Sequence, residues 1–180
     1  MFSRLGVFFL DILQTVLLAV AIFMLAYLFL TQPHKVDGHS MDPNFFDGEY
    51  LLSDKLSYRL GEPKRGDVIV FNAPIDRQKD FIKRIIALPG DTVMLKDGKV
   101  YINGELYPEP YLPEDTLTTP GASLTNGVSR ITQEDEYIVF GDNRSNSYDS
   151  RSWGPIKRRD IIGRAWFVYW PPKLIGVIPR

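Results

Sequence analysis

The chain has 180 residues, no cysteine, and 21 Lys and Arg against 22 Asp and Glu, which gives a formal net charge of -1. This length supports one folded domain with its own core. The balanced charge argues against nucleic acid as a partner, because phosphate binding needs a strongly basic surface. The lack of cysteine excludes disulfides, thiolate catalysis and cysteine-ligated metals. We expect no metal site, and we expect both histidines, His34 and His39, at the surface.

The first predicted element is a membrane-spanning helix. Residues 12–30 are almost entirely apolar, and at about 1.5 Å per residue they cover most of an about 30 Å hydrocarbon core. A cleaved secretory signal would end in a small-x-small site, whereas the Ala-x-Ala here, residues 19–21, lies inside the apolar run. We therefore expect residues 1–35 to hold an uncleaved anchor and its exit, with a buried core helix as the alternative. Arg4 favours a cytoplasmic N-terminus, and Lys35 nearly balances it.

Residues 36–180 predict a single strand-rich domain. After Pro33 the chain shows short alternating runs broken by Gly, Pro, Asn and Asp, as is typical of strands joined by turns. The expected strands cover residues 49–56, 67–73, 80–88, 91–104, 136–141 and 163–170. Asp97-Gly98 predicts a hairpin tip within the fourth of these. Residues 107–127 are rich in Pro, Thr and Gly and predict an irregular surface excursion.

The strand "DFIKRIIAL" contains a lysine in apolar surroundings. Alternate side chains share a face, so Lys83 points to the same side as Phe81 and Ile85. Burial disfavours an ammonium ion and lowers its pKa, and a neutral amine can accept a proton or attack as a nucleophile. A lysine that extends its amine to solvent or pairs with an acid remains the structural alternative.

The segment "DGHSMDPNF" places a serine in a predicted tight turn. Ser40 follows Gly38, so the turn could expose the hydroxyl and direct the backbone N–H of Ser40 at a developing oxyanion. A serine needs a base to take its proton, and His39 is badly placed to reach a neighbouring hydroxyl. Ser with Lys is therefore the remaining catalytic combination.

The polar segment "GDNRSNSYDSRSWGP", residues 141–155, follows the strand "EYIVF". Taken alone it is a loop in which Asx and Ser turns satisfy the backbone. It also offers support for a catalytic site: Ser147 could orient an amine, and Asp149 and Arg151 could form ion pairs that fix the loop. Its spacing does not match a calcium-binding loop.

Taken in chain order, "GHSMDP", "RGDVIVF", "FIKRIIALPGD" and "GDNRSNSYDSRSWGPI" follow the apolar segment. This series resembles the successive motifs of the bacterial type I signal peptidases, or leader peptidases, from the anchor to about Trp170. The resemblance implies coiled, mainly antiparallel sheets behind a single anchor. It also implies a serine endopeptidase, without a cofactor, that removes signal peptides from exported preproteins at the outer face of the cell membrane. Signal peptides and the lipid bilayer would be its partners.

The resemblance assigns roles residue by residue. Ser40 matches the nucleophile and Lys83 the general base of the Ser-Lys dyad of that family. Ser147 matches the serine that hydrogen-bonds the lysine amine. The charged residues that hold the family's site together are matched by Arg84, Asp149 and Arg151.

Other positions near the dyad bear on the oxyanion and on specificity. Gly38 stands where some members carry a hydroxyl residue, so oxyanion stabilisation would rest mainly on backbone N–H groups, and Asn44 replaces the usual Thr. Met41, Phe81 and Ile82 are expected to line the substrate pockets. Because these side chains are bulky and apolar, we expect cleavage after small residues, in the Ala-x-Ala pattern.

Two other functions remain open at this point. One is a self-cleaving repressor with a Ser-Lys pair; such repressors are soluble and carry a DNA-binding domain. The other is an anchored β-domain that only binds proteins, with Ser40 and Lys83 both structural. The distance between the Lys83 amine and the Ser40 hydroxyl distinguishes an enzyme from a binding module. Catalysis requires about 3.2 Å or slightly more, and a separation beyond about 6 Å favours the binding module.

Overall fold

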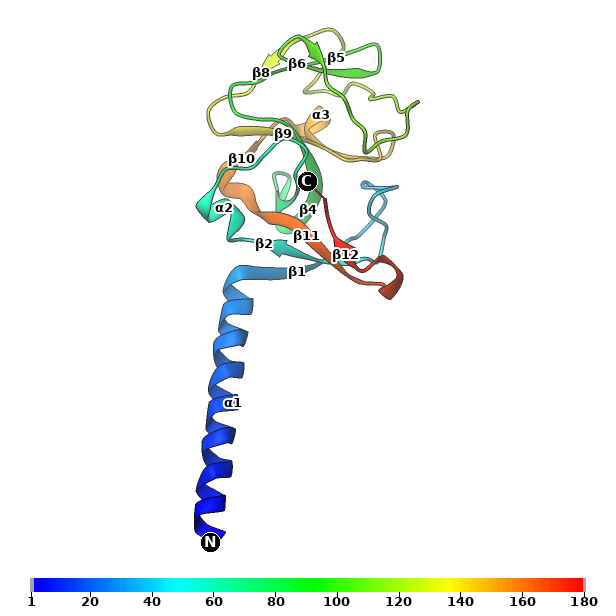
Figure 1. Cartoon of the computed structure of the whole chain (residues 1–180). Coiled ribbons are helices and arrows are strands. Elements are labelled where there is room, and N and C mark those ends of the chain that lie inside the picture. The colour runs from blue at the N-terminus through cyan, green and yellow to red at the C-terminus, as the bar shows by residue number, and fades with distance from the viewer. Residues whose placement is uncertain (1, 180) are drawn as a thin grey trace.

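The structure, a computed structural model, describes residues 2–179. A long N-terminal helix, α1 (Phe2–Leu30), leads into a domain built from two sheets (Figure 1). The larger sheet contains β1 (Thr31–Lys35), β2 (Tyr50–Asp54), β3 (Val68–Ala73), β4 (Asp76–Ala87), β9 (Glu136–Phe140), β10 (Ile156–Lys157), β11 (Ile161–Trp170) and β12 (Gly176–Val177). The smaller sheet contains β5 (Thr92–Lys96), β6 (Lys99–Ile102), β7 (Glu105–Leu106) and β8 (Arg130–Ile131). The short helices are α2 (Ser57–Leu60), α3 (Ser150–Trp153), η1 (Arg158–Asp160) and η2 (Pro172–Leu174).

Helix α1 projects from the domain as a separate rod (Figure 1). Its stretch Gly6–Leu25 has a mean hydropathy of 2.4 and is long and apolar enough to cross a membrane. Every residue from 6 to 25 is exposed, so the helix does not form part of the domain core. Such a continuous apolar surface is unfavourable in water, and a bilayer is the environment that would bury it.

The larger sheet runs in the order β1-β2-β11-β3-β4-β9-β10, with β12 paired to β11. Its strands pair antiparallel throughout, and the smaller sheet has the order β7-β6-β5-β8. The predicted fold class, an apolar helix followed by mainly antiparallel sheets, is confirmed. Each of the six predicted strand segments overlaps at least one observed strand, although β4 and β11 begin before their predicted segments, and the hairpin tip lies at Asp97 and Gly98, both with positive φ.

Strand β1 was not predicted as a strand. The segment TQPHK was assigned to the exit of the anchor, because it carries no apolar alternation, yet Thr31 pairs with Asp54 and Lys35 with Tyr50. The helix end is tied to the same sheet, since the N–H of Lys55 donates to the carbonyl of Leu30. The chain therefore passes from α1 directly into an end strand of the larger sheet.

Strand β4 contributes its two faces to different parts of the core. On one face Phe81 and Ile85 pack with the cluster around Phe71, and on the other Ile82 packs against the cluster that includes Val70. Lys83 lies on the Phe81 face, with its amine 5.4 Å from the Phe81 ring centroid. The predicted alternation along β4 is therefore observed.

Phe140, at the end of β9, is a core residue, and two arginines of the loop after β9 pack against its ring. Its side chain is fully buried between the sheets, and the guanidinium groups of Arg144 and Arg151 lie 5.3 and 5.5 Å from its ring centroid. We expect Phe140→Ala to lower the free energy of unfolding by about 3–5 kcal/mol, because it removes a large buried side chain and leaves a cavity. Denaturant unfolding of the chain in detergent measures this. The exposed Leu106→Ala is the control, with an expected change of about 0.5 kcal/mol or less.

Candidate active site

Ser40 is presented by a loop, residues 36–49, whose two ends are tied together. The N–H of Val36 donates to the carbonyl of Glu49 at 2.7 Å, and the N–H of Gly48 donates to the carbonyl of Val36 at 3.0 Å. Within the loop, the N–H groups of Asn44 and Phe45 both donate to the carbonyl of Met41 at 3.0 Å. The predicted turn is therefore present, directly after the nucleophile candidate.

Met41, the residue after Ser40, lies in the core. Its side chain is fully buried in the core cluster that also holds Val36, Phe45 and Leu51, and it is not among the residues that line the cavity beside Ser40. The expectation that Met41 contributes to a substrate pocket stays a prediction. A flexible thioether side chain fills core space well, and here it anchors the turn that carries Ser40.

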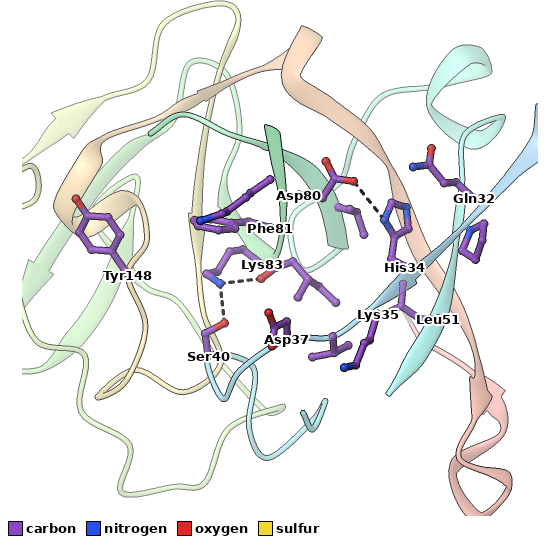
Figure 2. Close-up of a pocket in the computed structure, with 15 residues that line it drawn as sticks. Gln32, His34, Lys35, Asp37, Ser40, Leu51, Asp80, Phe81, Lys83 and Tyr148 are labelled. Carbon is purple, nitrogen blue, oxygen red and sulfur yellow. Dashed lines mark hydrogen bonds and ion pairs between the residues drawn. The ribbon is translucent and has the colours of Figure 1, made fainter. Parts of the chain in front are cut away.

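Lys83 reaches Ser40 from β4. Its amine nitrogen lies 2.7 Å from the hydroxyl oxygen of Ser40 and donates to the carbonyl of Ile82 at 2.9 Å (Figure 2). The separation is inside the range that catalysis requires, and far below the distance expected of a module that only binds. Lys83 is 4% exposed. Burial lowers the pKa of its amine to about 8, although the carboxylates of Asp149 and Asp142 act in the opposite direction.

Two buried ion pairs hold the loop that follows β9. Arg84 donates from Nε and Nη2 to the two carboxylate oxygens of Asp142, at 2.9 and 2.6 Å. Arg151 does the same to Asp149, at 2.8 Å for both bonds. Bidentate pairs of this kind are strong and directional, and breaking one partner of a buried pair is strongly destabilising. The first pair links β4 to the loop, and the second fixes the loop's own turn.

The loop after β9 also contacts the Ser40 turn directly. Asn143 donates its backbone N–H to the carbonyl of Ser40 at 3.0 Å and its side-chain amide to the carbonyl of His39 at 2.9 Å. Asn44 donates to Asp142 at 2.8 Å and so joins the turn to the Arg84 pair. These bonds fix the position of Ser40 relative to β4.

The predicted roles of Ser147 and Gly38 stay predictions. The Ser147 hydroxyl is buried and has no hydrogen-bond partner within residues 2–179, so the expected bond to the Lys83 amine is not formed in this structure. Gly38 has φ +89°, which favours glycine, and its N–H donates to Asp47 at 2.8 Å. Its N–H is therefore already used within the loop.

A cavity of about 620 Å³ opens beside the dyad (Figure 2). Ser40, Lys83 and Tyr148 lie at one end and Gln32 and His34 at the other. Its remaining walls include side chains from three strands and the segment after β1: Val36, Asp37, Leu51, Val70, Asp80, Phe81 and Ile82. Phe81 and Ile82 therefore occupy the predicted position at the cavity.

Both histidines were expected at the surface. The side chain of His39 is 63% exposed, whereas that of His34 is 9% exposed and lines the cavity. The expectation for His34 is corrected: the pairing of β1, which carries no sequence signal, turns this side chain inward. Among the described residues no group of three or more His, Asp and Glu side chains is placed to hold a metal ion.

A family model described as "Signal peptidase, peptidase S26" matches residues 9–170. The chain belongs to this family of signal peptidases. Probable signal peptidase I-2 of Synechocystis sp. is 37% identical over 175 residues, which cover 94% of this chain and 77% of that protein. Signal peptidase I of Bacillus licheniformis is 39% identical over 162 residues, covering 88% and 87%. Signal peptidase IB of Staphylococcus aureus is 33% identical over 175 residues, covering 89% and 91%.

A solved signal peptidase I from Enterococcus faecalis covers 58% of this chain and 97% of its own, at 31% identity and a TM-score of 0.49. The family membership that the sequence motifs predicted is confirmed by the family model and the sequence relatives. The chain is accordingly a serine peptidase of the signal peptidase family.

Several residues of the site were not singled out from the sequence. Asp142, Asn143 and Gly141 lie in the polar segment that attracted attention, but nothing in it distinguished them from their neighbours. The cavity residues from β1, β2 and β3, namely His34, Leu51 and Val70, gave no signal. Their contribution depends on how the sheet coils.

Gly141 makes a prediction about the site. A Cβ at this position would collide with the Ser147 hydroxyl and with the backbone carbonyl of Ser40. We expect Gly141→Ala to push the Ser40 turn away from Lys83 and to reduce peptidase activity about 100-fold, because small displacements of reacting groups cost that much. Gly176→Ala is the control, because φ is not positive at either glycine and a Cβ at position 176 meets its nearest atom only at 3.9 Å. Equal activity in both variants would contradict the close approach.

Proposed function

We propose that the chain is a membrane-anchored endopeptidase that removes signal peptides from exported preproteins, with Ser40 as nucleophile and Lys83 as general base. The observation that carries the proposal is the 2.7 Å contact between the Ser40 hydroxyl and a lysine amine that is buried. The low pKa of that amine supports it, since a neutral amine is present in quantity near pH 8.

The first half of the reaction forms an acyl-enzyme. The Ser40 oxygen attacks the carbonyl carbon of the scissile bond while the neutral Lys83 amine accepts the hydroxyl proton. The resulting ammonium then gives this proton to the departing amine of the mature protein. The acyl-enzyme ester is hydrolysed by a water molecule that Lys83 deprotonates in the same way.

The oxyanion of each tetrahedral intermediate needs hydrogen-bond donors that are already in position. The backbone N–H of Ser40 donates no hydrogen bond to any of residues 2–179, which leaves it able to donate to the oxyanion. The N–H of Gly38 is engaged by Asp47. Arg84, Asp149 and Arg151 act at a distance, by holding the loop that positions Ser40.

An extended substrate can bind by strand addition. Strand β9 pairs with β4 only between Arg84 and Ala87, so residues 76–83 have an edge without a strand partner among the described residues, and β1 ends the sheet. Both strands line the cavity. A peptide lying between them places alternate side chains on the inner face, and positions −1 and −3 then point into the enzyme. The −3 side chain would meet Leu51, Val70 and Ile82.

The anchor would place the cavity near the membrane surface. Helix α1 ends at Leu30, and β1 leads directly to the end of the cavity at Gln32. A signal peptide whose apolar segment lies in the same bilayer would enter from this end. Arg4, before the apolar span, favours a cytoplasmic N-terminus and a catalytic domain on the outer side, and Lys35 on the other flank nearly balances its charge.

The dyad predicts a pH dependence. Because Lys83 acts as the neutral amine, kcat/KM for a model preprotein should rise with pH along a limb with its midpoint at about pH 8. Lys83→Ala should fold and lose activity about 100-fold or more, whereas Lys96→Ala, an exposed lysine on β5, should keep it. A Lys83→Ala enzyme that retains a tenth of the activity would refute the role of Lys83.

The pockets predict specificity for small residues at −1. In a series of preproteins with Ala, Leu and Phe at −1, we expect cleavage after Ala and none at the intended bond after Leu or Phe, because the bulky side chains of Phe81 and Ile82 next to Lys83 should exclude large residues. Mass spectrometry of the products identifies the bond that is cut. Efficient cleavage after Phe would overturn the pocket assignment and leave the dyad unaffected.

A further inference from the structure

The cavity has a polar end that the proposed dyad and the −1 and −3 pockets do not use. There His34 from β1 faces Asp80 from β4, with His34 Nδ1 3.5 Å from Asp80 Oδ2 (Figure 2). His34 Nε2 lies 2.9 Å from the hydroxyl of Ser53, which is fully buried. This end of the cavity therefore holds a charged side chain whose position is fixed by neighbours on other strands.

Asp80 keeps hydrogen-bonding capacity that its neighbours do not use. Its Oδ1 accepts from the Asn72 side-chain amide at 3.0 Å, and its Oδ2 faces His34. A carboxylate offers about four acceptor positions, and the Asp80 side chain is 34% exposed, at the cavity. A donor on a bound molecule can therefore reach it.

The His34 ring supports Asp80 as an anion without competing for the cavity. Burial lowers the pKa of His34, although Asp80 opposes this, so the ring is neutral at neutral pH. With its hydrogen on Nδ1, the neutral ring presents that hydrogen to Asp80 Oδ2, 3.5 Å from Nδ1, while Nε2 faces the Ser53 hydroxyl, which also donates to the carbonyl of Gln32 at 3.3 Å. Both ring nitrogens therefore face protein atoms, and Asp80 is the charged group here that a ligand can reach.

The register along β4 indicates which substrate residue would reach Asp80. Asp80 and Ile82 are two residues apart and share one face of the strand, as do their partners Asn72 and Val70 on β3. A substrate strand repeats with the same period. If the −3 side chain meets Ile82, the next inward side chain on the membrane side of the cavity is −5, and it faces Asp80.

We propose that Asp80, positioned by His34 and Asn72, forms a third substrate subsite that takes a −5 side chain carrying a neutral hydrogen-bond donor: Ser, Thr, Asn or Gln. This inference rests on the proposed function and names a specificity determinant of the same site. A neutral donor is favoured over a charged one because the lining of the whole cavity contains Lys35 and Lys79 as well as Asp37 and Asp80, so its formal charges balance when the Lys83 amine is neutral. The subsite binds substrate and takes no part in proton transfer.

The test uses the full chain in detergent and preproteins with Ala at −1 and −3 and either Gln or Val at −5. For the wild type we expect kcat/KM to be about two- to tenfold higher with Gln, the effect of one net hydrogen bond. Asp80→Ala should bring the ratio to about one. Because the ratio compares two substrates on one enzyme, any general loss of activity in the variant cancels. Asp115→Ala, which removes an exposed carboxylate outside the cavity, should keep the wild-type ratio.

The outcomes separate this subsite from the proposed function. If the wild type cleaves neither preprotein, the proposed function fails. If it cleaves both with a ratio of one, or if Asp80→Ala keeps the wild-type ratio, the −5 subsite is refuted and the function stands. If Asp80→Ala fails to fold, His34→Phe is the second variant. It keeps an aromatic ring at this position and removes the nitrogen that faces Asp80. It should lower the ratio by at least about half, and an unchanged ratio would again refute the subsite.

Discussion

The chemistry proposed for this site depends on one buried contact, between the Lys83 amine and the Ser40 hydroxyl. Lys83 is 4% exposed and its pKa is lowered from 10.5 to about 8, which corresponds to a free-energy cost on the order of 3 kcal/mol. Because the folded-state pKa is lowered, the cost is absent above pH 10.5, grows as the pH falls toward 8, and is complete below that value. A fold that keeps such a cost gains a neutral amine at 2.7 Å from Ser40.

The Ser40 loop and the loop after β9 together fix the contact between Ser40 and Lys83. The Ser40 loop is held in the core by the buried side chains of Met41 and Phe45. It is also held by the hydrogen bonds that Asn143 donates to its backbone carbonyls. Arg84 follows Lys83 on β4 and pairs with Asp142 in the second loop. Strand β4 therefore carries both the Lys83 amine and, at the next residue, the Arg84 guanidinium that fixes the loop after β9.

Much of the fold and the dyad followed from local patterns and ordered motifs. The apolar run could be recognised because a membrane span needs little beyond length and hydropathy, and the central strands because alternation is a local signal. The loop after β9 was recognised as polar and constrained, but the partner of Arg84 was not, since nothing local ties Arg84 to Asp142. Strand β1 was missed because TQPHK becomes a strand only by pairing with β2.

The family, the apolar helix, the strand-rich domain and the pair of residues able to act as nucleophile and base could all be predicted from the sequence, because composition, periodicity and ordered motifs are signals within the chain itself. The tertiary structure decided which side chains surround that pair. It turned His34 into the cavity, and it brought Asp80 of β4 beside β1. The reason is physical: β1 and β4 are separated in the sheet by β2, β11 and β3, and only its coiling brings them together.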